Sequence, residues 1–188
     1  MRLFVALDIP EDVRSALAAF LATLRPACRN ARWMRMENLH VTLRFIGETP
    51  DEQIEIIKKA LAAIPSRATI PITFRGLGFF PDERRPQVLW AGIKAGVELV
   101  ALAEAVDSAL GPLGIPREER TFTPHLTLAR LESPRILHSL HEAVKNAGRL
   151  AFGRTSAGEF HLYQSLLKPA GPEYTRLATF SFLGSKPE

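Results

Sequence analysis

The chain has 188 residues, 46% of them hydrophobic and 23% charged, with a formal net charge of +4. The length predicts one domain or two small lobes sharing a core, and the apolar fraction excludes wholesale disorder. The mild positive charge permits a phosphate-bearing ligand but argues against a histone-like binder of long nucleic acids. The longest apolar runs, such as Leu3–Leu7, fall far short of the roughly 20 residues of a membrane helix, and the single cysteine, Cys28, excludes an internal disulfide and a Cys-x-x-Cys zinc site. We therefore expect a cytoplasmic protein with no membrane contact.

Hydrophobic periodicity and helix-stop residues divide the first half of the chain into five elements. The expected elements are a strand at Arg2–Asp8, a helix from Pro10 to Leu24, a strand at Leu39–Ile46, a helix from Pro50 to Ile64, and a strand at Ile70–Phe74. Thr49 is expected to cap the second helix, and Glu52 to complete a capping box. The last strand is expected to end in a glycine-rich turn at Gly76–Gly78.

The second half of the chain follows the same plan. The expected elements are a strand at Val88–Ile93, a helix from Gly96 to Leu110, a strand at His125–Leu131, a helix that begins at Pro134, and strands at Leu150–Phe152, Glu159–Leu166 and Tyr174–Leu183. The apolar stripe of the first of these helices is expected to include Val97 and Val100. Ser133 is expected to cap the second helix.

The two halves are related by a repeat of 85 positions, which separates Leu3 from Val88 and His40 from His125. Two copies of one strand–helix plan predict a pseudo-twofold pair of lobes rather than a solenoid. We therefore predict an α+β fold in one bilobal domain, residues 1–188, with repeat halves at about 1–86 and 87–188. Each lobe is expected to be a mostly antiparallel sheet with two helices outside, and a central cleft to lie between the sheets.

Both halves carry His-x-Thr-Leu at the equivalent place, as His40 with Thr42 and as His125 with Thr127. Residues i and i+2 of a strand share a face about 6.6 Å apart, so each imidazole and hydroxyl can grip one small anion. Across a pseudo-twofold cleft the two pairs suit in-line displacement at phosphorus, which needs a base on one side and an acid on the other. Imidazole can serve as either at neutral pH, and hydroxyls can bind the non-bridging oxygens. Alternation also places Arg44 on the histidine face.

Three segments carry a resemblance to a known family. They are Trp33–Leu43 (Trp-x-Arg-x-Glu-Asn-Leu-His-Val-Thr-Leu), Pro124–Arg130 (Pro-His-Leu-Thr-Leu-Ala-Arg) and Leu162–Ser165 (Leu-Tyr-Gln-Ser). The chain resembles the two-histidine phosphoesterases, in particular the RNA 2′,3′-cyclic phosphodiesterases, also called the 2′-5′ RNA ligase family. The resemblance extends over nearly the whole chain, and it implies a metal-independent enzyme without a cofactor.

The resemblance implies a role for each residue of the two motifs. His40 would be the general acid that protonates the leaving O3′ of a terminal 2′,3′-cyclic phosphate, and His125 the general base that activates water, leaving a 2′-phosphate. Thr42 and Thr127 would hold the phosphate. Symmetry alone does not decide which histidine is the acid. The reverse reaction with an RNA 5′-hydroxyl in place of water would join ends through a 2′-5′ link.

Phe45 and Arg130 both occupy the fifth position after a histidine. The resemblance implies that they form the two walls of a slot for the terminal base, by stacking and by a cationic guanidinium. Strict alternation places both on the face away from the histidines, so this role requires a bulge or bend after each motif. Phe45 as a core residue and Arg130 as a surface salt-bridge partner remain alternatives, and Arg44 and Arg35 are weaker candidates for contact with backbone phosphate.

Two classes of function stay open. The first is a monomeric phosphodiesterase acting on RNA 2′,3′-cyclic phosphate ends, on small cyclic nucleotides or on another small 2′-linked nucleotide. The second is a non-catalytic module on the same fold that binds RNA ends or nucleotides. A matched acid and base favour the enzyme, because binding alone needs neither. His138 and His141 have a helical i, i+3 spacing that can bind a metal, but no third ligand joins them, so we expect no metal site.

Overall fold

A computed structural model of the chain describes residues 1–28, 31–131, 138–147, 150–169 and 171–183. Its strands are β1 (Arg2–Asp8), β2 (Ala31–Trp33), β3 (His40–Glu48), β4 (Ile70–Phe80), β5 (Val88–Ala95), β6 (His125–Leu131), β7 (Ala151–Ala157), β8 (Glu159–Lys168) and β9 (Gly171–Ser181). Its α-helices are α1 (Glu11–Leu24), α2 (Ile54–Ala62), α3 (Val97–Leu110) and α4 (His138–Ala147).

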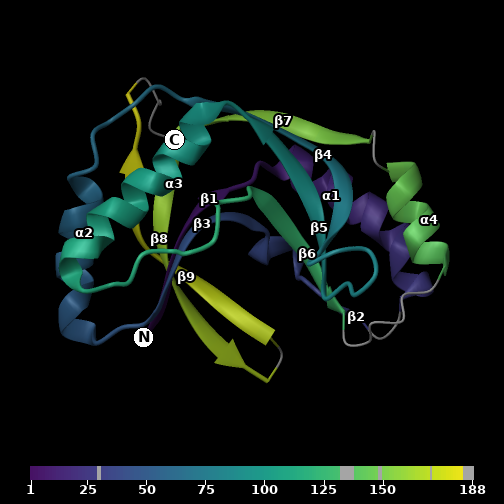
Figure 1. Ribbon diagram of the computed structural model, residues 1–188, viewed down its shortest axis with the longest axis horizontal. Helices are drawn as coiled ribbons and strands as arrows, with labels where there is room; N and C mark the ends of the chain where they lie inside the picture. The colour runs from purple at the N-terminus through teal and green to yellow at the C-terminus, as the bar shows by residue number, and fades with distance from the viewer. Residues whose placement is uncertain (29–30, 132–137, 148–149, 170, 184–188) are drawn as a thin grey trace.

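The strands form two antiparallel sheets. The first sheet has the order β3-β1-β8-β9, and the second has the order β2-β6-β5-β4-β7. Helix α3 packs against β3 and α2, whereas α1 packs against β7 and α4 against β4. Figure 1 shows α2 and α3 on one flank and α1 and α4 on the opposite flank, with the strands between them. The prediction of an α+β fold with two antiparallel sheets is confirmed.

The lobes do not coincide with the repeat halves. The first sheet combines β1 and β3 with β8 and β9 from the end of the chain, and the second sheet takes β2 and β4 from the first half. The helices follow the same exchange, because α1 covers the second sheet and α3 covers the first (Figure 1). Each lobe is therefore built from both halves of the chain.

Alternation along β1 sets the core of the first lobe. Leu3, Val5 and Leu7 are buried on the face that is covered by helices. On α3 the buried residues are Leu99, Leu102, Ala103, Val106 and Leu110, whereas Val97 and Val100 are 79% and 38% exposed. The expected stripe was wrong at these two valines, because the helix turns its leucine face to the sheet. No helix in the described ranges is long and apolar enough to cross a membrane.

The expected capping box before α2 is absent. The Thr49 hydroxyl donates to the carbonyl of Gly47 at 3.2 Å, and the Thr49 backbone N–H donates to the carbonyl of Met1 at 2.7 Å. A short 3₁₀ turn at Asp51–Gln53 leads into the helix without a side-chain cap. Thr49 is buried and closes the end of β3 instead, so it is unavailable to the helix start.

The glycines after Phe74 form no turn, because β4 continues through them to Phe80. Its register against β5 shifts between Phe74 and Leu77, where Gly76 has φ +72°. The segment is therefore a bulge, which glycine accommodates because the left-handed region is open to it. The short strand β2 had no counterpart among the expected elements, and the Ser133–Pro134 helix start lies outside the described residues.

Candidate active site

His40 is the first residue of β3, and the turn before it fixes its imidazole. The ring Nδ1 lies 2.7 Å from the carbonyl of Asn38. A carbonyl only accepts, so Nδ1 carries the proton and Nε2 keeps the lone pair. Phe4 and Tyr174 pack against the ring, at centroid distances of 4.7 and 5.3 Å. The Asn38 side chain also donates to the carbonyl of Pro172 at 2.8 Å, which fixes the start of β9 beside this turn.

His125 repeats this arrangement at the start of β6. Its Nδ1 lies 2.7 Å from the carbonyl of Thr123, again two residues earlier, so Nε2 is again the free nitrogen. Phe80 packs edge-on against the ring at a centroid distance of 4.9 Å. The two histidines are therefore presented in the same tautomer by equivalent contacts.

The two rings also share one electrostatic environment. Strand β3 lies in contact with β6, so the histidine strands of the two sheets meet. Burial lowers the pKa of His40, and the charge on His125 lowers it further, whereas the hydrogen bond to Asn38 and the carboxylate of Asp8 raise it. The net shift is downward, so the unliganded ring is neutral at neutral pH.

Each histidine strand contains a bulge at the same place. The register of β3 against β1 skips Leu43, and the register of β6 against β5 skips Leu128. Alternation therefore reverses after each bulge, and Phe45 and Arg130 return to the histidine face. Phe45 is 56% exposed, and the ring of Phe4 lies between it and His40, at 6.2 Å from Phe45. The bulge required by the sequence argument is confirmed, and Phe45 is not a core residue.

The same bulge turns Arg44 away from the histidine face, contrary to the expectation from alternation. Arg44 is 9% exposed, and its Nε lies 2.7 Å from Asp107 on α3. Its Nη1 lies 3.3 Å from Glu118. Arg44 therefore holds β3 against α3 and is not available to a phosphate, while the exposed Arg35 pairs with Glu37.

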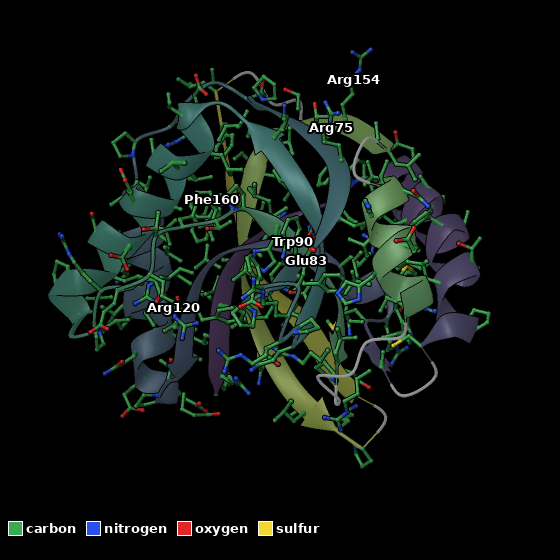
Figure 2. The ribbon with its side chains drawn as sticks, turned by 45° about the vertical axis from the view of Figure 1, so that its right-hand side comes forward. Arg75, Glu83, Trp90, Arg120, Arg154 and Phe160 are labelled. Carbon is green, nitrogen blue, oxygen red and sulfur yellow. The ribbon has the colours of Figure 1, made fainter. Side chains whose placement is uncertain are left out.

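Thr42 and Thr127 lie one position before the bulges and are half-buried. Neither hydroxyl has a hydrogen-bond partner among the residues that the structure describes, so both can donate to a ligand. The cross-strand partner of Thr127 is Trp90, which lies between the two helical flanks (Figure 2). A Cβ on Gly78 would lie 2.3 Å from the indole of Trp90, so the indole lies directly against glycine backbone of β4.

A polar cluster beside His40 was not singled out in the sequence. Asp8 at the end of β1 accepts a hydrogen bond of 2.5 Å from the Tyr163 hydroxyl, and Arg176 donates to its other carboxylate oxygen. Burial and the carboxylate raise the pKa of Tyr163 to about 12. Tyr163 belongs to the Leu162–Ser165 segment that carries the family resemblance, which was the one available signal.

His161, also on β8, borders this cluster and is 1% exposed. Its Nδ1 lies 3.0 Å from the Thr179 hydroxyl, and its Nε2 lies 3.7 Å from Asp8 and 3.5 Å from Glu159. Burial is the largest influence on its pKa, which is lowered. These contacts tie His161 to β9 and to the Asp8 cluster, which is a structural role.

Tyr174 on β9 lies within the electrostatic reach of charged groups from both sheets. Burial raises its pKa, while the charges of Arg130 and Arg2 lower it. Its ring packs edge-on against His40, as described above. The guanidinium of Arg130, from the second sheet, is thus close enough to act on a residue that touches His40 in the first.

The described residues contain no group of three or more His, Cys, Asp or Glu side chains that could hold a metal ion. His141 on α4 donates from Nε2 to the carbonyl of Glu83 at 2.9 Å and packs against Phe79. The side chain of His138 lies outside the described residues.

The chain matches the family model described as LigT like Phosphoesterase over residues 7–90 and 93–174. An RNA 2′,3′-cyclic phosphodiesterase of Archaeoglobus fulgidus is 34% identical over 180 residues, covering 96% of this chain and 99% of the relative. The crystal structure of TT0787 of Thermus thermophilus has a TM-score of 0.82 at 34% identity, covering 99% of this chain and 100% of that one. Escherichia coli LigT complexed with 3′-AMP has a TM-score of 0.79 at 26% identity, with coverage of 97% and 98%.

Proposed function

This chain belongs to the LigT-like phosphoesterase family, and we propose that it hydrolyses terminal 2′,3′-cyclic phosphates of RNA or nucleosides to 2′-phosphates. The observation that carries the proposal is the duplicated presentation of His40 and His125. Both rings hold the proton on Nδ1, and the charge of one acts on the other. An acid–base pair at one phosphorus needs this geometry, whereas a binding site does not.

The reaction follows from the roles of the four motif residues. The Nε2 of His125 takes a proton from water as the water oxygen bonds to phosphorus. The P–O3′ bond breaks, and protonated His40 gives its Nε2 proton to O3′. The hydroxyls of Thr42 and Thr127 donate to the non-bridging oxygens, where negative charge increases. The products are a 2′-phosphate and a 3′-hydroxyl, and an RNA 5′-hydroxyl that attacks phosphorus in place of water would form a 2′-5′ link by the same steps.

The lowered pKa of His40 places a condition on this assignment. A neutral imidazole is a base, so His40 must gain a proton before it can act as an acid. An anionic phosphodiester bound next to the ring favours the imidazolium and raises its pKa. The acid is therefore formed in the enzyme–substrate complex, and substrate binding is expected to take up a proton.

Phe45 and Arg130, the exposed residues that follow the two bulges, support a substrate with a terminal base. Phe45 offers a ring face for stacking, and Arg130 offers a guanidinium, as a slot for a single base requires. The family member from E. coli has been crystallised with 3′-AMP, a nucleotide with its phosphate on the ribose 3′ position. We propose that the terminal nucleoside occupies this slot while its cyclic phosphate lies between the two histidines.

The test is incubation with an oligonucleotide that ends in a 2′,3′-cyclic phosphate, followed by identification of the product end group. We expect a 2′-phosphate, and we expect His40→Ala and His125→Ala each to lower turnover by at least about 100-fold. His141→Ala is the matched control, because His141 lies on α4 outside the site, and it should keep its activity. A chelator should leave the rate unchanged.

Wild-type rates in either histidine variant would overturn the proposed mechanism. Tight binding of the cyclic end without any turnover would instead identify a non-catalytic module. A rate that depends on an added divalent ion would require a different mechanism.

A further inference from the structure

We propose that Asp8 is a positioning residue that favours the protonated form of His40, and that it thereby gives His40 the acid role and leaves the base role to His125. This inference rests on the proposed function and adds to it the reason why two equivalent histidines act differently. Its basis is the place of Asp8 in the sheet, the contacts that fix its carboxylate, and the residue at the equivalent place beside His125.

Asp8 and His40 are direct cross-strand partners, at the end of β1 and the start of β3. Side chains directly opposite each other in an antiparallel pair share a face, with Cβ atoms about 4.5–5.5 Å apart. Asp8 therefore lies on the same face as the imidazole. Its side chain is 39% exposed, so its charge is partly screened but not quenched.

The carboxylate is held in place from the neighbouring strands of the same sheet. Tyr163 on β8 donates its hydroxyl to Oδ1 at 2.5 Å, and Arg176 on β9 donates to Oδ2. With both oxygens engaged, the carboxylate has a fixed orientation beside His40. A charge that is fixed in advance needs no reorganisation when the imidazolium forms.

The equivalent place in the second sheet holds no carboxylate. The cross-strand partner of His125 is Gly92. A Cβ at Gly92 would lie 2.6 Å from the backbone carbonyl of Arg75, so a side chain does not fit there. The pseudo-symmetry of the two histidine strands is therefore broken at the Asp8–Gly92 pair, and only His40 has an acidic neighbour in register.

The other titratable groups near Asp8 and His40 also affect the protonation of His40. His125 from β6 disfavours a positive charge on His40, whereas Asp8 favours it. Tyr174 from β9 is uncharged at neutral pH, since burial raises its pKa. Around Asp8 itself, Arg176 opposes its effect and the buried His161 lies 3.7 Å away.

Asp8→Asn is the variant that tests the inference, because it keeps the shape and removes the charge. We expect the pKa of His40, followed by NMR titration of its ring protons, to fall. A lost charge at this distance corresponds to roughly a threefold to tenfold loss of turnover at pH 7–8. The loss should diminish as the pH falls, because His40 becomes protonated in both proteins.

Two further variants separate charge from structure. Asp8→Glu restores a carboxylate and should recover most of the rate and of the His40 pKa. Glu159→Gln removes a carboxylate that lies 3.5 Å from His161 but does not act on His40, so it should leave the profile unchanged. Circular dichroism of each variant identifies one that fails to fold, and the Asp8→Glu protein then carries the comparison.

The outcomes distinguish this inference from the function on which it rests. If Asp8→Asn gains activity at pH 5, His40 is the base and the assignment is overturned. If the wild-type protein turns over the cyclic phosphate but Asp8→Asn shifts neither the His40 titration nor the rate, Asp8 has no such role. If the His40 titration shifts but the wild-type protein has no turnover, the proposed function fails while the electrostatic link stands.

Discussion

Replacing Phe45 by alanine separates the two roles that this residue could have. Phe45 is 56% exposed, so its ring contributes much less to folding than a buried phenylalanine, whose loss typically costs about 3–5 kcal/mol. Stacking of a single base on an aromatic ring is worth about 1–3 kcal/mol. Because about 1.4 kcal/mol corresponds to a factor of ten, Phe45→Ala should raise KM for a nucleoside 2′,3′-cyclic phosphate by roughly 5-fold to 150-fold.

The assay is steady-state hydrolysis together with urea unfolding of the same protein. We expect kcat to change little, because Phe4 separates Phe45 from His40, and the free energy of unfolding to fall by less than about 1.5 kcal/mol. Ile56→Ala is the matched control, since Ile56 is 51% exposed but lies on α2. A large loss of stability with an unchanged KM would show that Phe45 is a packing residue and would refute the slot.

Two further predictions concern charge and stability. Arg44→Met leaves the carboxylates on α3 and in the following loop without their buried partner, so the free energy of unfolding in urea should fall by about 3 kcal/mol. The control Arg35→Ala removes an exposed pair and should lower the free energy of unfolding by less than about 1 kcal/mol. Equal losses in the two variants would contradict the role assigned to the buried guanidinium. Burial lowers the pKa of His161 from 6.5, so the unfolded chain binds a proton first and the protein should lose stability as the pH falls below about 6.5. His161→Asn should flatten this dependence between pH 7 and 5, and an unchanged slope would refute it.

The sequence predicted the local structure around the two histidine motifs well. The His-x-Thr-Leu frame and its repeat predicted two similar strands, and β3 and β6 pair antiparallel with β1 and β5, respectively. The need for a bulge after each frame followed from the fifth-position residues alone, Phe45 and Arg130. The bulges at Leu43 and Leu128 meet that need in both strands.

The sequence predictions were wrong where contacts with distant segments of the chain override a local pattern. Alternation placed Arg44 on the histidine face, but the bulge moved it towards Asp107, far away in the chain. A capping frame at Thr49 was overridden by a backbone hydrogen bond to Met1. Asp8 looked like a strand end, and only the register of β1 against β3 shows that it faces His40.

Because each sheet contains strands from both halves of the chain, the molecule cannot be divided into two independent lobes by cutting the chain between the halves. A fragment ending at residue 86 would keep His40 but lose β8 and β9, and with them Tyr163, Arg176 and the ring of Tyr174. The complementary fragment would keep His125 on a sheet without β2 and β4. Neither fragment contains a complete sheet, so the separated halves would have to associate again to bring the two imidazoles together. The two histidines therefore depend on one folding unit.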